Sequence, residues 1–269
     1  MNVPHYRLSV ATASHKGDRA YQQDKVEVLQ HPYEKNCFMV VVADGMGGRS
    51  GGAMAAQQVV ASARERLALF DVKKDDPQAM LRQLVQDAHA VIHLLKVSSE
   101  LDPHSTIAAY VVLPSSTCHW IHSGDSRIYH FRKGRLLTRT RDHSHVQELL
   151  NRGKINARQA VGHRESNLLT GCLGMDAEPP IDLSSIAQLE VGDVILSCTD
   201  GLWAYFPDTE LAKLTAALTP VDACRQLLDA ARTRAAGKGD NVSLAIVKVG
   251  PPSKSVAAEE ESSLLDFKW

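Results

Sequence analysis

The sequence predicts an α+β fold, a four-layer α-β-β-α sandwich in which two central antiparallel sheets are flanked by helices. The first observation is the continuous apolar run FMVVVA at Phe38–Ala43, which is typical of a strand covered on both faces. The second is a long block, residues 107–138, that contains only strand patterns. A regular alternation of strands and helices does not fit such a block, so we expect layered sheets with the helices grouped on the outside.

Local patterns place the elements of the first half. Strands at Arg7–Ala13 and Lys25–Leu29 lead into and out of a polar loop, and the run at Phe38–Ala43 stops at Asp44 in a glycine-rich turn. Two helices follow, because apolar residues recur at helical spacing. The first has its stripe at Ala53, Ala56, Val60, Ala63 and Leu67, and the second, over residues 77–95, at Met80, Leu84, Ala88, Val91 and Leu95.

The second half begins with strand patterns and ends with two helices and a strand. The expected strands are 107–113, 117–122, 127–132, 136–138, 181–189 and 194–198. Asp142 and Ser144 are candidate caps for a short helix at 146–151. Helices fit residues 208–217 and 221–235, and a last strand alternates at Val242, Leu244 and Ile246.

One domain is expected over residues 1–250. Within it, the segment from about 146 to 170 is polar and weakly patterned, as in a mobile insert. From Pro251 the composition shifts to PPSKSVAAEEESSLLDFKW, so residues 251–269 are expected to form an acidic, disordered tail.

Composition excludes several classes of protein. The 269 residues carry a formal net charge of −1, which gives no overall basic field to attract nucleic acid or an anionic membrane. No stretch approaches the roughly 20 apolar residues that cross a bilayer, and the N-terminus lacks a signal-peptide pattern. The five cysteines form no CxxC pair, so we expect neither disulfides nor a zinc site, and a cytoplasmic location.

Five aspartates stand at the ends of predicted strands: Asp24, Asp44, Asp125, Asp200 and Asp240. Side chains at strand ends can converge in space, and converging carboxylates repel each other unless cations lie between them. Oxygen ligands favour hard ions such as Mg²⁺, Ca²⁺ and Mn²⁺. Two such ions can lower the pKa of a shared water from about 16 toward 7, which is the chemistry of a phosphoester hydrolase. Any one of these aspartates alone would be read as turn chemistry, and only the joint pattern points to metal.

The order and spacing of these blocks resemble the PP2C family of metal-dependent serine/threonine protein phosphatases, in its bacterial form. The resemblance covers about residues 8–249. The matching blocks, in order, are GDRAYQQD, VVADGMGGRSGG, STIAAYVV, HSGDSRIYHFRKGRLLTRTRDHS, LLTGCLG, DVILSCTDGLW and GDNVSLAIV. It implies hydrolysis of phosphoserine and phosphothreonine by metal-activated water, a role in signal transduction, phosphorylated proteins as partners, and a cognate Ser/Thr kinase in the same cell.

The resemblance also implies a role for each acidic position. Asp44 would bridge two core Mn²⁺ or Mg²⁺ ions, and the carbonyl of Gly45 would hold one of them. Asp200 and Asp240 would complete the other site, and Asp24 would hold metal-bound water. These residues are the expected core of the metal centre.

Further positions match the family around this core. Asp125 corresponds to the ligand of a weaker third ion, which Asp200 also holds. Arg19 corresponds to the arginine that binds phosphate, and its guanidinium offers paired donors to two phosphate oxygens. Asn241 would support Asp240, and the segment 146–170 would be the flap that helps choose substrates. Gln23 stands where many members have Glu, so it can hydrogen-bond a metal-bound water without adding charge.

Two alternatives remain beside the enzyme. A catalytically silent PP2C-like domain could bind a partner, although every acidic metal position that we can match is intact. The fold could also act on a small phosphate ester or a nucleotide instead of a protein. Met46 follows Asp44-Gly45 where eukaryotic relatives have a histidine, which leaves the proton donor open, and a metal-bound water is our hypothesis for it.

Overall fold

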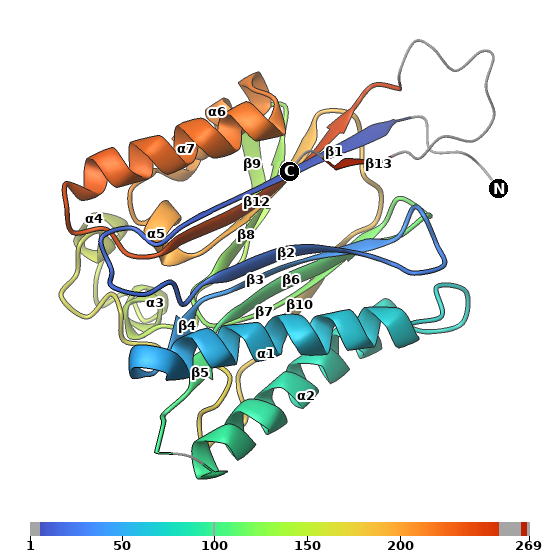
Figure 1. Ribbon diagram of the computed structural model, residues 1–269. Helices are drawn as coiled ribbons and strands as arrows, with labels where there is room; N and C mark the ends of the chain where they lie inside the picture. Colours follow the sequence, from blue (N-terminus) through green and yellow to red (C-terminus); the bar gives the residue numbers. More distant parts are fainter. Residues whose placement is uncertain (1–5, 99, 253–264, 268–269) are drawn as a thin grey trace.

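The computed structural model, which describes residues 6–98, 100–252 and 265–267, has the four layers that the sequence predicts (Figure 1). One sheet has the strand order β13 (Leu265–Phe267), β1 (Arg7–His15), β12 (Val242–Gly250), β11 (Asp193–Cys198), β8 (Arg127–Arg132) and β9 (Arg135–Arg139). The other has the order β10 (Asp182–Ile186), β7 (Cys118–Ser123), β6 (Ile107–Val112), β3 (Phe38–Ala43) and β2 (Lys25–Gln30). All neighbours in these sheets pair antiparallel except β13, which pairs parallel with β1.

The apolar run of β3 divides between two cores. Met39, Val41 and Ala43 pack toward the helices, whereas Phe38, Val40 and Val42 pack between the sheets, and all six are fully buried. Because successive side chains of a strand point to opposite faces, a strand in the middle of a sandwich must be apolar at every position. The expectation of a strand covered on both faces is confirmed.

Helices cover the outer face of each sheet (Figure 1). The five-stranded sheet is covered by α1 (Gly48–Leu69) and α2 (Pro77–Ser98), and the six-stranded sheet by α6 (Asp208–Ala217) and α7 (Pro220–Ala235). Helix α7 starts where Thr219 accepts from the Asp222 N–H at 3.2 Å, and it ends at a left-handed Ala236. Within the described residues, no helix is long and apolar enough to cross a membrane.

The short helix expected at residues 146–151 is present as α3 (His145–Asn151), and Ser144 caps it by accepting from the Gln147 N–H at 3.3 Å. Several other short elements are absent from the sequence prediction. Helix α4 (Ala157–Ala160), within the segment 146–170, starts with a capping box between Asn156 and Gln159. A one-turn helix α5 (Asp200–Trp203) follows β11. The two-residue strands β4 (Gly45–Met46) and β5 (His104–Ser105) pair with each other and belong to neither large sheet. Most of the predicted disordered tail lies outside the described residues, and β13 is its described part.

Candidate metal centre

The strand register brings the five predicted aspartates to one end of the sandwich. Because Lys25 pairs with Ala43, Asp24 before β2 lies beside Asp44 after β3. In the other sheet β11 ends opposite the start of β12, which carries Asp200 and Asp240 to the same end. Asp125 lies in the turn between β7 and β8, and each of these strands belongs to a different sheet.

Mutual repulsion shows that these carboxyl groups face one another. Burial first, and then the charges of Asp24, Asp200, Asp125 and Asp240, hold the pKa of Asp44 well above its ordinary value. Burial also raises the pKa of Asp24 to about 8, although the Thr199 hydroxyl lowers it, and Asp200 and Asp240 add to the rise.

Asp200 and Asp125 behave in the same way. Burial raises the pKa of Asp200 to about 6, with Asp240 as the next cause. The pKa of Asp125 is held well above its usual range by burial and then by Asp200 and Asp142, while Arg127 opposes the rise. If all these carboxyl groups ionise, their negative charges repel one another. Divalent cations bound between them remove this repulsion, so the group is suited to bind such ions.

One buried atom in this group has no partner. Asp200 Oδ1 is shielded from solvent and accepts no hydrogen bond from the described residues. A buried carboxylate oxygen of this kind is costly unless something fills its coordination position, and a hard cation does so. The donor set therefore fits Mg²⁺ or Mn²⁺.

The turn after β3 holds Asp44 through its backbone. Its N–H donates to Thr106 Oγ1 and its carbonyl accepts from the Thr106 N–H, both at 2.9 Å. The next residue must be glycine, because a Cβ on Gly45 would stand 2.0 Å from the carbonyl oxygen of Gly52 and 2.6 Å from that of Gln23. This close packing fixes the carbonyl of Gly45 beside the predicted bridging carboxylate.

The loop that carries Arg19 is tied to the centre by Asn241. The Asn241 amide nitrogen donates to the carbonyls of Lys16 and Tyr21 at 2.8 and 3.0 Å. The Arg19 guanidinium, whose side chain is 59% exposed, forms an ion pair with Asp240. Arg19 therefore lies at the solvent-exposed side of the aspartate group, where its guanidinium can contact a bound ligand.

Gln23 is also placed by this network. Its N–H donates to Asn241 Oδ1 at 2.6 Å, and its side-chain amide donates to the carbonyl of Gly48, also at 2.6 Å. Asn241 therefore supports the whole loop, which is more than the local support of Asp240 that the sequence predicts, and Gln23 fastens the loop to the start of α1.

Sequence reasoning missed Thr199. Its hydroxyl donates to Asp24 Oδ2 at 2.8 Å and accepts from the Ser243 N–H at 3.0 Å, so one buried side chain joins both sheets. The only local hint of its role in the sequence is its position directly before Asp200. The two partners lie 175 and 44 residues away, and no local pattern points to them.

A second cluster contains histidines but differs from a metal centre. His122, His143 and Asp182 have ligand atoms within 4.8 Å of one another. The two rings stack 4.6 Å apart at 15°, so their in-plane lone pairs run side by side instead of converging on one ion. His122 Nε2 donates to the carbonyl of Arg141 at 2.7 Å, and His143 Nδ1 accepts from the Gly124 N–H at 3.2 Å. We interpret the cluster as a hydrogen-bonded support.

Comparison with known proteins gives a consistent result. Residues 12–235 match the family model described as protein phosphatase 2C. The serine/threonine phosphatase stp of Listeria monocytogenes is 30% identical over 202 residues, 73% of this chain and 78% of that protein. A solved serine/threonine phosphatase of S. agalactiae has a TM-score of 0.81 at 25% identity and covers 90% of this chain and 99% of its own. The Mycobacterium tuberculosis phosphatase PstP/Ppp has a TM-score of 0.78 at 26% identity, over 91% and 99% of the two chains.

Proposed function

This chain belongs to the protein phosphatase 2C family, and we propose that it is a metal-dependent phosphatase that hydrolyses phosphoserine and phosphothreonine in proteins. The observation that carries the proposal is the convergence of five aspartates from both sheets at one end of the sandwich. The family match covers the strands that bring Asp24, Asp44, Asp125 and Asp200 together. Asp240 lies five residues beyond it, beside the same group.

The cofactor in this proposal is Mn²⁺ or Mg²⁺. A related structure, the catalytic domain of PstP, is described as a complex with two manganese ions. Asp44 and the carbonyl of Gly45 would hold the core ions together with Asp200 and Asp240, and Asp125 would hold a weaker third ion. When bound, the ions act as Lewis acids that make water acidic enough to attack phosphorus near neutral pH and that offset the charge of the phosphoryl group.

The protein itself positions the substrate. Arg19 extends from a loop that Asn241 holds in place, so its guanidinium can take two phosphate oxygens with little loss of side-chain freedom. Asp24 lies 2% exposed behind the centre and is oriented by Thr199, which suits a residue that holds a water molecule in a fixed direction. Asp44 is fixed through its own backbone, which sets the position from which its carboxylate would hold the core ions.

Substrate class and cell context extend the proposal. We infer that the segment 146–170, with its two short helices, is a flap that borders the site and contacts the phosphorylated protein. The substrates would be proteins phosphorylated by a cognate Ser/Thr kinase. A cytoplasmic location is supported by five cysteines that are all unpaired and buried.

The experiment that tests this function is hydrolysis of a phosphothreonine peptide in Mn²⁺, in Mg²⁺ and in EDTA. Turnover that requires either ion and disappears in EDTA is the expected result. The Asp44→Asn variant serves as the inactive control, with circular dichroism to show that it is folded. If the folded parent protein shows no turnover with any ion, the domain is instead a silent member of the family that binds a partner.

A further inference from the structure

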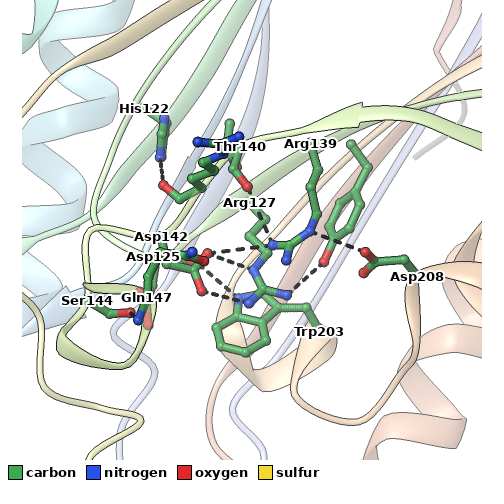
Figure 2. Close-up of polar contacts among 12 residues, drawn as sticks. His122, Asp125, Arg127, Arg139, Thr140, Asp142, Ser144, Gln147, Trp203 and Asp208 are labelled. Carbon is green, nitrogen blue, oxygen red and sulfur yellow. Dashed lines mark hydrogen bonds and ion pairs between the residues drawn. The ribbon is translucent and has the colours of Figure 1, made fainter. Parts of the chain in front are cut away.

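A buried arginine lies next to the aspartate group without being part of it. Arg127, on β8, donates from Nε and Nη2 to the two oxygens of Asp142 at 2.8 and 2.6 Å, and from Nη1 to the Tyr129 hydroxyl at 3.2 Å. Its guanidinium carbon lies 3.5 Å from the centre of the Trp203 ring (Figure 2). Arg127 and Asp142 are only 13% and 8% exposed in their side chains, so this is a desolvated pair. Three N–H groups of the guanidinium and one of its faces are therefore engaged within the protein.

Trp203 connects this arginine to the metal centre. Its Nε1–H donates to the backbone carbonyl of Asp125 at 2.9 Å (Figure 2). Trp203 is the last residue of the one-turn helix α5, and Asp200 is the first. The indole therefore spans from the helix that carries Asp200 to the turn that carries Asp125. The family resemblance assigns these two aspartates to the weaker third ion, which is called the outer ion below.

Asp142 connects the same arginine to the base of the flap. Asp142 stands four residues before the flap, and its neighbour His143 is held at both backbone groups. The His143 N–H donates to the carbonyl of Gly124 at 2.8 Å, and its carbonyl accepts from the Thr170 N–H at 2.9 Å, where the flap ends. The two ends of the flap thus meet at the residue after Asp142, next to the turn that carries Asp125.

We propose that Arg127 is a positioning residue that holds Asp125 at the separation from Asp200 that the outer metal ion requires, and that it ties this separation to the base of the flap. The inference rests on the proposed function and assigns a residue that acts through Trp203 and Asp142 instead of touching substrate. Residues that orient metal ligands from behind typically change metal affinity 10- to 100-fold when they are replaced.

The chain offers a matched control on the same strand. Arg132, at the other end of β8, donates to both oxygens of the fully buried Asp193, so its replacement also breaks a forked ion pair with a buried carboxylate. It pairs with Asp193, the first residue of β11, and with Glu190 just before that strand, and neither belongs to the aspartate group. Loss of stability without a change in metal binding is expected for Arg132→Met.

The test is a titration of full-length protein with Mn²⁺, in which electron paramagnetic resonance measures free Mn²⁺ without any enzymatic reaction. For Arg127→Met we expect the weakest Mn²⁺ binding step to weaken by about 10-fold or more, with the tighter steps unchanged. The Mn²⁺ concentration for half-maximal hydrolysis of a phosphothreonine peptide should rise in parallel. Trp203→Phe keeps an aromatic ring under Arg127 and removes the N–H that holds Asp125, so it should weaken the same step without depending on the ion pair.

The outcomes separate this inference from the proposed function. If the parent protein binds no Mn²⁺, the metal-dependent function itself is wrong, and the inference falls with it. If the parent binds Mn²⁺ and Trp203→Phe gives the same isotherm, the inference alone is overturned. The inference is also overturned if Arg127→Met and Arg132→Met weaken the weakest Mn²⁺ binding step equally, because Arg127 would then act only through general stability. Should Arg127→Met not fold, Trp203→Phe decides the question.

Discussion

Replacement of Thr199 by valine tests whether one buried hydroxyl joins the two sheets behind the aspartate group. Valine has nearly the same shape, so the change removes the hydroxyl with little effect on packing. Two contacts are lost, the bond to Asp24 at 2.8 Å and the bond from the Ser243 N–H at 3.0 Å. Thr199 precedes α5 without capping it through its side chain, so no helix cap is lost with it.

The magnitude follows from these two contacts. Because the pKa of Asp24 is raised to about 8, its carboxyl is mostly protonated at pH 7 in EDTA, and the lost bond is worth about 1 kcal/mol. The buried Ser243 N–H is left without an acceptor, which costs about 1–3 kcal/mol. We therefore expect Thr199→Val to lower the free energy of unfolding by about 2–4 kcal/mol, or the Tm by about 5–12 °C.

The assay is urea unfolding followed by circular dichroism at pH 7 in EDTA. Thr199→Ser retains the hydroxyl and should restore most of the loss. Thr215→Val is the matched control, because that fully buried hydroxyl donates to the carbonyls of Leu211 and Ala212 within its own helix, and its removal leaves no donor unpaired. The reasoning is refuted if Thr199→Val and Thr199→Ser unfold within about 0.5 kcal/mol of each other.

Three further predictions concern the metal centre and its ligands. Asp44→Asn should abolish peptide hydrolysis with loss of at least one core ion, and retained activity at saturating Mn²⁺ would contradict the bridging role. Arg19→Ala should mainly raise KM for phosphopeptides, because a ground-state phosphate contact is lost, and a fall in kcat alone would contradict it. In EDTA the folded protein holds protons on Asp24 and Asp200 that the unfolded chain releases above about pH 4, so its stability should fall as pH rises from about 4 to 8. Saturating Mn²⁺ should reduce this fall, and a Tm that is flat or rising in EDTA would count against the raised pKa values.

Much of the fold could be predicted because the pattern of each main element is local. The alternation of buried faces in Phe38–Ala43 and the apolar stripes of α1 and α2 depend on residues a few positions apart. In α2 the buried face passes through Ile92, whereas Val91, which the sequence places on the stripe, is exposed. The short elements could not be predicted in this way. A one-turn helix such as α5, or the pair formed by β4 and β5, has too few residues for a period to appear, and each is held by contacts with distant segments.

The sequence by itself determined which residues form the main strands and which of these strands are followed or preceded by an aspartate, because these properties depend on side-chain period and on turn residues. Only the tertiary structure decided what those aspartates face. The bond from Thr199 to Asp24, the stacking of Arg127 on Trp203 and the orientation of the 16–23 loop by Asn241 join residues 76 to 225 positions apart. The first contact depends on how the two sheets pack face to face, and the other two depend on which strands are neighbours within one sheet. No run of neighbouring residues contains that information.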